Sequence, residues 1–148
     1  MSKLKIHNME DVYKEFIKEH PDTILSYKMF KSIISQFNKK AAQKILEGHT
    51  LWLGHKLGNI RIKKIERANY SKPAIDWGET NKLKKQGIEK HVYFTDNFYF
   101  RWFWEKARCQ VTNKSVYRFR PSGGPNGNRR ALVNLLKQDE FAMLNFKS

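Results

Sequence analysis

The stretch from residue 48 to residue 67 constrains the fold of this chain more than any other. Apolar residues alternate with other residues on both sides of a short turn that closes at Gly58, and this is the period of a β-strand. Because strand side chains alternate between the two faces of a sheet, Ile62 points away from Arg61 and Lys63. The stretch therefore predicts a β-hairpin over 51–67, with one packed face and one cationic face.

Two helices are expected before this hairpin. Asn8 is a good N-cap with Asp11 three residues later, and the apolar positions that follow share one helical face until Pro21. Ser26 caps a second run, in which apolar residues recur every three or four positions until Gly48. The elements that we expect after the hairpin are a short helix over 77–85, a second hairpin of residues 91–95 and 98–104 with an aromatic face, a strand over 115–120, a helix from Asn128 and a strand near Phe146.

The charge of the chain points to a polyanionic partner. Its 148 residues include 29 Lys and Arg against 14 Asp and Glu, a formal net charge of +15. A membrane surface is the rival to nucleic acid, but no run approaches the ~18 apolar residues of a spanning helix, and no signal peptide opens the chain. We therefore expect a soluble protein that is not secreted, with DNA nearby and no membrane contact.

No arrangement of residues predicts catalysis or metal binding. The five histidines have no ligand spacing, and Cys109 is the only cysteine. Turn formation and charge pairing explain Asp96 and Glu105 more simply than an acid–base pair does. We expect no enzyme activity, no cofactor and no metal.

Basic residues on strands with apolar opposite faces are the best candidates for contact with nucleic acid, because they would form one cationic surface. The amide groups of the glycine-rich loop 123–127 are a further candidate site for a phosphate at the start of the last helix, with Arg129 and Arg130 beside them. The residues that we expect to contact DNA are Arg61, Lys63, Lys64, Arg67, Arg118, Arg120, Arg129 and Arg130.

The aromatic residues of 91–104 predict an oligomer interface. An inserted hairpin with aromatic residues on both faces cannot cover them by itself, and leaving them exposed costs on the order of 10 kcal/mol. Stacking on unpaired bases is the alternative use of such rings. The interface residues that we expect are Tyr93, Phe98, Phe100, Trp102 and Trp104.

Two separated motifs resemble the HU and integration host factor family of DNA-bending proteins. The first is Ile45-Leu46-x-Gly48-x-x-Leu51-x-Leu53 with Leu57-Gly58-x-Ile60-x-Ile62-x-x-Ile65-x-Arg67, and the second is Tyr117-x-Phe119-x-Pro121-Ser122-Gly123 with Arg130-x-Leu132-Val133-Asn134. The resemblance implies one α+β domain over 1–148. Its core would be residues 1–67 and 115–148, with two N-terminal helices, a three-stranded antiparallel sheet and a C-terminal helix, and residues 68–114 would form an inserted aromatic hairpin arm.

The arm is longer and more aromatic than the DNA-wrapping arm of that family. The chain is also similar to small, very basic virion-associated proteins of crAss-like tailed phages of Bacteroidetes hosts. This resemblance implies a structural virion protein, made in the host cytoplasm, that assembles with itself and with other virion proteins, for example as a ring between portal and tail with its basic face toward DNA. A free HU-like dimer that bends DNA or regulates transcription is the alternative, and a module for single strands or RNA is the third.

Overall fold

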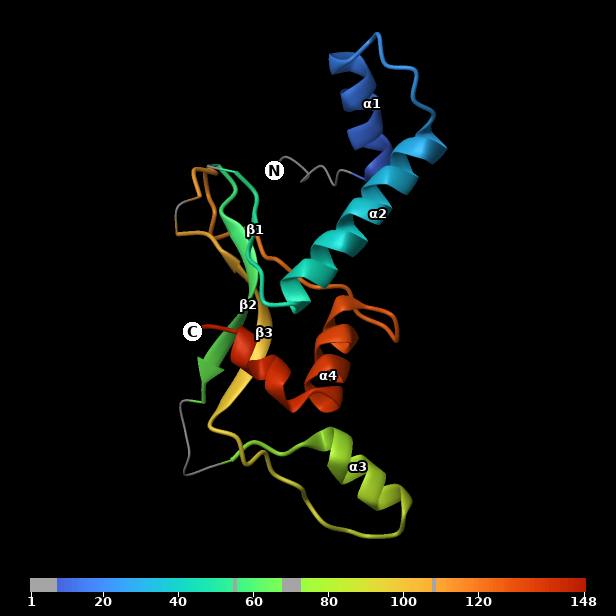
Figure 1. Cartoon of the computed structure of the whole chain (residues 1–148). Helices are drawn as coiled ribbons and strands as arrows, with labels where there is room; N and C mark the ends of the chain where they lie inside the picture. Colours follow the sequence, from blue (N-terminus) through green and yellow to red (C-terminus); the bar gives the residue numbers. More distant parts are fainter. Residues whose placement is uncertain (1–7, 55, 68–72, 108) are drawn as a thin grey trace, which may run out of the picture. The chain divides into compact units, whose positions relative to one another are not determined.

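The computed structural model describes residues 8–54, 56–67, 73–107 and 109–148. Its fold is α+β, as expected, and the described residues form four α-helices, one three-stranded antiparallel sheet and a terminal 3₁₀ helix. Two compact units, Met1–Lys44 and Ile45–Ser148, are described separately. The elements in chain order are α1 (Met9–Glu19), α2 (Tyr27–Leu46), β1 (Leu51–Trp52), β2 (Asn59–Glu66), α3 (Trp77–Lys85), β3 (Phe98–Glu105), α4 (Asn128–Gln138) and η1 (Glu140–Asn145) (Figure 1).

The first unit is a pair of helices whose ends lie where the sequence predicts them. The side chain of Asn8 accepts hydrogen bonds from the amides of Glu10 and Asp11, and the Asp11 carboxylate accepts one from the Asn8 amide, so a capping box starts α1. The rings of Tyr13 and Phe16 each lie 5.4 Å from the ring of Phe30 on α2. These contacts hold the apolar face of α1 against the first turns of α2.

The predicted hairpin of the second unit is confirmed. Strand β1 pairs antiparallel with β2 in the register Leu51 to Ile60. Gly58 closes the turn with a φ of 75°, a left-handed conformation that favours glycine. A Cβ atom at this position would also collide with the carbonyl oxygen of Glu105, so the close approach of the next strand requires glycine as well.

The third strand of the sheet is β3, which pairs antiparallel with β2 along all eight residues of each strand. The sheet order is β1-β2-β3. The expected second hairpin is therefore wrong, because residues 91–95 do not pair with β3. Their backbone groups bond elsewhere: the carbonyl oxygen of Val92 accepts from the Asp76 amide and the Phe94 amide donates to Ala74.

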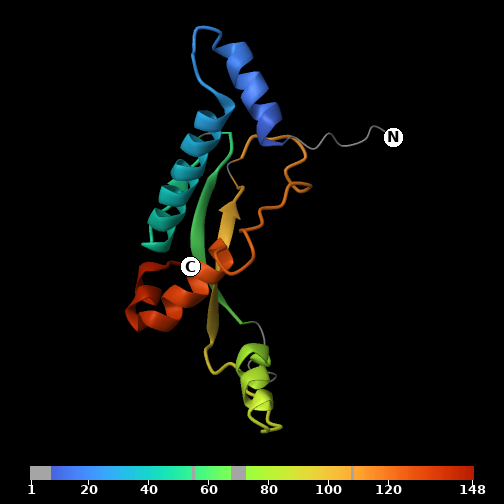
Figure 2. The same ribbon diagram turned by 90° about the vertical axis from the view of Figure 1, so that its right-hand side faces the viewer.

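The core of the second unit lies between one sheet face and the C-terminal elements. Ile62 and Trp102 are opposite each other on β2 and β3, and both are buried. The Trp102 indole N–H donates to the carbonyl oxygen of Asn128 at the start of α4 (3.0 Å), and the ring of Phe100 lies 5.5 Å from that of Phe146. Figures 1 and 2 show α4 and η1 together on this side of the β2–β3 ladder. The opposite face of the ladder is thus left for other contacts.

Two further strand predictions are wrong. Residues 115–120 form no strand, and the long edge of β2 is paired with β3 instead. The segment near Phe146 forms the 3₁₀ helix η1 instead of a terminal strand, with its first turn capped by the Asp139 side chain. Lys147 lies beside the sheet, where its carbonyl oxygen accepts from the amide of Lys64.

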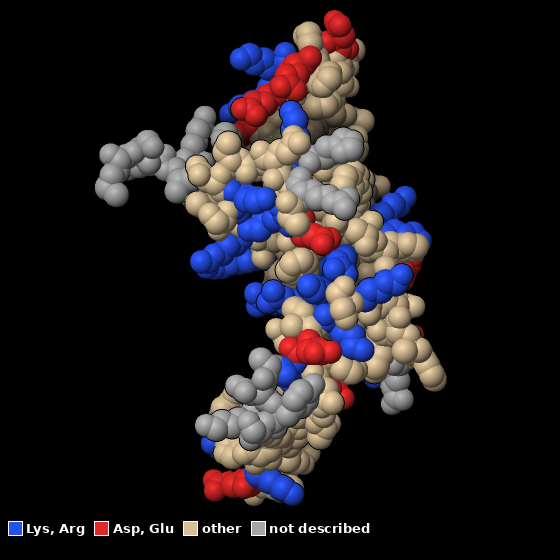
Figure 3. Space-filling view, turned by 90° about the vertical axis from the view of Figure 1, so that its left-hand side faces the viewer, with Lys and Arg blue, Asp and Glu red and all other residues tan. Residues whose placement is uncertain are grey.

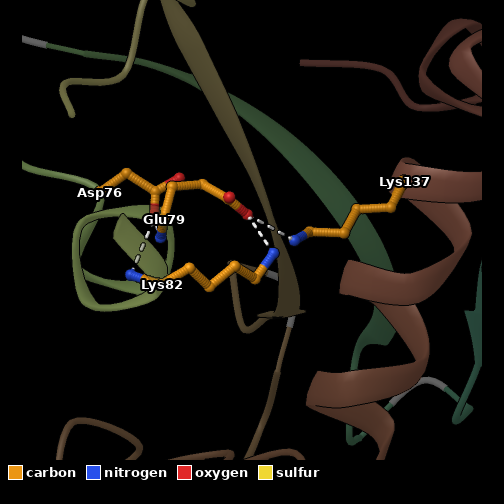
Figure 4. A network of polar contacts seen from close by, with 5 residues as sticks. Asp76, Glu79, Lys82 and Lys137 are labelled. Atoms are coloured by element: carbon orange, nitrogen blue, oxygen red, sulfur yellow. Dashed lines mark hydrogen bonds and ion pairs between the residues drawn. The ribbon is translucent and has the colours of Figure 1, made fainter. Parts of the chain in front are cut away.

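Helix α3 lies in the connection between β2 and β3 and is tied to α4 by an ion pair. The Glu79 carboxylate lies 2.7 Å from the Lys82 ammonium on the same helix and 3.3 Å from the Lys137 ammonium on α4 (Figure 4). Hydrogen bonds from these two lysines hold the pKa of Glu79 below its ordinary value. Asp76 caps the N-terminus of α3 through the amides of Gly78 and Glu79.

Candidate nucleic-acid interface

The face of β2 and β3 that points away from α4 carries cations. Arg61 and Lys63 alternate with the buried Ile62, so they lie on the opposite side of the sheet, as the sequence predicts. The register places Phe103 and Arg101 of β3 directly opposite these two residues. Figure 3 looks at the left-hand side of the view in Figure 1, away from α4, and Lys and Arg side chains gather over its middle part.

The centre of this face is a pair of like charges. Lys63 and Arg101 are directly opposite each other across the two strands. The Lys63 ammonium lies 5.1 Å from the centre of the Phe103 ring and the Arg101 guanidinium 5.8 Å from it. Neither cation forms an ion pair with a carboxylate in the described part of the chain. Phe103 thus sits between two cations that no described carboxylate neutralises.

The two other cations of this face are held by backbone oxygens. Arg67 donates from Nε to the carbonyl oxygen of Asp96 (3.1 Å), and its guanidinium lies over the rings of Phe94 and Tyr99. Arg61 donates to the carbonyl oxygens of Lys147 and Ser148 and lies 3.9 Å from the carboxylate of Glu105. The carbonyl oxygen of Asp96 orients the Arg67 guanidinium without cancelling its charge, whereas the Glu105 carboxylate partly neutralises Arg61, whose side chain is 19% exposed. Arg67 and Arg61 are therefore fixed at the ends of the cationic face.

The remaining candidate residues do not all join this face. Lys64 points to the other side of the sheet, where its ammonium lies 4.0 Å from the centre of the Phe98 ring. Arg118 and Arg120 are not on a strand, so the single cationic surface expected from the sequence does not form. They line a groove at the outer edge of β3, together with Arg129, whereas Arg130 is exposed on α4 and is not among the groove residues.

The aromatic residues expected at an oligomer interface have different environments. Trp102 is only 7% exposed, because α4 covers it within one chain. The Trp104 indole N–H donates to the carbonyl oxygen of Leu57 (2.6 Å), while Phe98 and Phe100 are half-buried. Tyr93 is 47% exposed. The area argument for a second subunit is therefore wrong for Trp102, since the chain covers this residue without one.

Four residues that line the cationic face or the groove were not identified as binding residues from the sequence: Arg101, Lys106, Tyr117 and Phe119. The signal for Arg101 is that it lies two positions before Phe103, with Trp102 between them, which places Arg101 and Phe103 on the same face of a strand. Their pairing with Lys63 and Arg61 follows only when β3 is known to be the neighbour of β2. Tyr117 and Phe119 belong to a segment without regular structure, for which period-two reasoning does not apply.

The described residues contain no group of histidine, cysteine or acidic side chains that could hold a metal ion. Within the same residues, no helix is both long and apolar enough to cross a membrane. Comparison of the chain with protein-family models, with curated proteins and with solved structures found no match. The function must therefore be argued from the geometry described above.

Proposed function

We propose that this chain is a non-enzymatic structural protein that lies against DNA and contacts its phosphates through the cationic face of β2 and β3. The pair of Lys63 and Arg101 carries this proposal. Like charges that face each other across strands destabilise a sheet, by roughly 0.2–1 kcal/mol per pair. A phosphate between the two side chains would convert that repulsion into two attractive contacts.

The rest of the molecule agrees with an anionic partner of this kind. The net charge of +15 attracts polyanions over the whole surface. Arg67 extends the cationic face beyond the central pair and is already oriented by a backbone oxygen, whereas Arg61 on the other side shares its charge with the Glu105 carboxylate. Contacts of this type read phosphate positions rather than bases, so binding would have little sequence specificity.

Within this function, the resemblances favour an assembled virion component of a tailed phage, such as a ring between portal and tail, over a free dimer that bends DNA. The observation that supports this choice is α3. In the HU and integration host factor family the segment that corresponds to 68–114 is a flexible arm that wraps DNA. Here β3 lies in this segment and pairs with β2, and the connection between these two strands contains α3, which Glu79 ties to α4 through Lys137. An arm held in this way suits fixed contacts between subunits.

The test of DNA contact is the salt dependence of binding to a duplex, measured by fluorescence anisotropy. If about six phosphates are neutralised, affinity should fall ~10³-fold between about 50 and 200 mM salt. Replacing Lys63 and Arg101 with glutamine should reduce the slope of log K against log salt by about two. The matched control replaces two exposed lysines of α2, Lys28 and Lys31, and should leave most of the slope unchanged. Equal slopes for both variants would contradict the proposal.

The test of assembly is the mass of the purified protein, alone and with duplex DNA, by native mass spectrometry. A ring component should form a closed oligomer larger than a dimer, or should do so when its virion partners are added. A stable dimer that binds and bends short duplexes would instead support the free DNA-bending protein. A monomer that binds neither DNA nor virion proteins would contradict both.

A further inference from the structure

A groove of about 580 Å³ lies between the outer edge of β3, the segment 117–121 and α4. Its lining includes six aromatic and five cationic side chains, and it contains no carboxylate. In Figure 2 the segment between β3 and α4 runs beside β3 on the side away from β2. The groove is therefore a different surface from the cationic face of the sheet, although Arg101 and Phe103 border both.

The wall of the groove opposite β3 is held at both of its ends. Near Tyr117, the Lys106 ammonium at the end of β3 donates to the carbonyl oxygens of Lys114 and Tyr117, both at 2.8 Å. At the other end, the Ser122 hydroxyl oxygen accepts from the amide of Asn128 at 2.9 Å. A segment tied at both ends loses little further entropy when a ligand binds. The groove is thus preformed.

The aromatic residues of the groove divide into fixed and accessible rings. The indoles of Trp102 and Trp104 are bound to backbone carbonyl oxygens and serve as walls. Tyr117 is 51% exposed, and Phe119 next to it in the groove is half-buried. Tyr117 is therefore the ring with the most free surface to stack on a ligand.

Three of the five cations of the groove are free to meet an anion. Arg118, Arg120 and Arg129 are all exposed. None of them forms an ion pair with a carboxylate among the residues that the structure describes. A guanidinium presents paired N–H donors that match two phosphate oxygens, so arginine suits phosphate better than a point charge does. Three such side chains along one groove fit a chain of phosphates.

We infer that this groove binds unpaired nucleotides of a single-stranded nucleic acid, with bases against Tyr117 and phosphates at the arginines. Aromatic rings beside a cationic track are the combination by which proteins hold single strands. A duplex could offer only its phosphates, because stacking hides the faces of its bases. An acidic peptide would match the charge but would leave the rings without a planar partner. The inference does not rest on the duplex contact proposed above.

The experiment measures the binding of labelled oligodeoxythymidine and oligouridine, each of about ten nucleotides, by fluorescence anisotropy. Tyr117→Ala should weaken binding by about 5- to 150-fold, the effect of losing one stacked base. Tyr117→Phe keeps the ring and should bind like the wild type. Comparison of the two oligonucleotides separates a DNA ligand from an RNA ligand.

Tyr93→Ala is the matched control, since Tyr93 is 47% exposed, is not among the groove residues and should leave single-strand binding unchanged. Circular dichroism of each variant checks that the fold is retained. Equal losses in both variants, or no single-strand binding by the wild type, would overturn the inference. So would an oligomer that dissociates on Tyr117→Ala, or binding of polyglutamate with the same dependence on Tyr117.

The two proposals can fail separately. Lys63→Gln should weaken duplex binding and leave the single strand bound, because Lys63 is on the sheet face and is not among the groove residues. Tyr117→Ala should weaken single-strand binding and leave the duplex bound. Loss of both activities in either variant would show that only one surface exists and would overturn the assignment of the groove.

Discussion

Lys63 and Arg101 should repel each other measurably in the free protein, and a cycle of charge reversals tests this. The variants are Lys63→Glu, Arg101→Glu and the double reversal. Each single reversal replaces a like pair by an opposite pair, whereas the double reversal restores a like pair, because the two residues are directly opposite in the register. The double variant should therefore be less stable than the sum of the two single effects predicts.

The size of this coupling follows from the geometry. The cycle contains two like pairs and two opposite pairs, and each contributes about 0.2–0.5 kcal/mol, the lower half of the range for cross-strand pairs, because Arg101 is exposed. The coupling free energy is therefore about 1–2 kcal/mol. Each cation also loses its contact with the Phe103 ring when it is replaced. The loss of each cation–ring contact appears in one single variant and also in the double variant. The coupling free energy subtracts the single effects from the double effect, so these losses cancel.

Urea and thermal unfolding, followed by circular dichroism at low salt, give the four stabilities. For a chain of this size, each kcal/mol corresponds to about 2–4 °C in Tm. The coupling should shrink in about 1 M salt, where the Debye length is about 3 Å. The control cycle combines Lys63→Glu with Lys64→Glu, because these neighbours point to opposite faces of β2. Its coupling should be close to zero.

A coupling of zero between Lys63 and Arg101, or one equal to that of the control cycle, would show that the two side chains do not face each other. The register-based argument for a phosphate between them would then be lost. A coupling of the expected sign, together with unchanged duplex binding in Lys63→Glu, would retain the register but would refute DNA contact at this face.

Two further predictions concern the scaffold. Gly58→Ala should lower the free energy of unfolding by about 2–5 kcal/mol, because left-handed backbone strain adds to a collision with the Glu105 carbonyl oxygen. Gly54 has a similar φ but open space around it, so Gly54→Ala should lower the free energy of unfolding by only about 1–2 kcal/mol. Urea titrations measure both effects. Equal losses would show that β3 does not approach Gly58. NMR titration of the Glu79 carboxyl group should give a lowered pKa, and this pKa should rise in Lys137→Ala. The stabilisation that ionised Glu79 contributes is present above the pKa of Glu79 in the unfolded chain and disappears as the pH falls through its pKa in the folded protein. An unchanged titration in Lys137→Ala would refute the ion pair between α3 and α4.

The local features of this protein were determined by short stretches of sequence. The cap residues Asn8 and Asp11 start α1, and Asp76 starts α3, because each satisfies amides within three residues of itself. The hairpin of β1 and β2 follows in the same way from alternation around Gly58. The cationic side of β2 was therefore predictable, since side-chain direction in a strand depends only on position parity.

The partner of β2 was decided by the tertiary structure. Residues 98–105 and 115–120 both show the period-two alternation of a strand. This alternation alone does not indicate which of the two segments pairs with β2. The longer segment pairs along eight residues and buries Trp102 under α4, a gain that depends on residues far apart in the chain. The same non-local choice placed Arg101 opposite Lys63, and it left 117–121 to form the groove at the edge of β3. The periodicity of a strand determines the face to which each of its side chains points. Which strand it pairs with depends on the apolar surface that the whole unit buries.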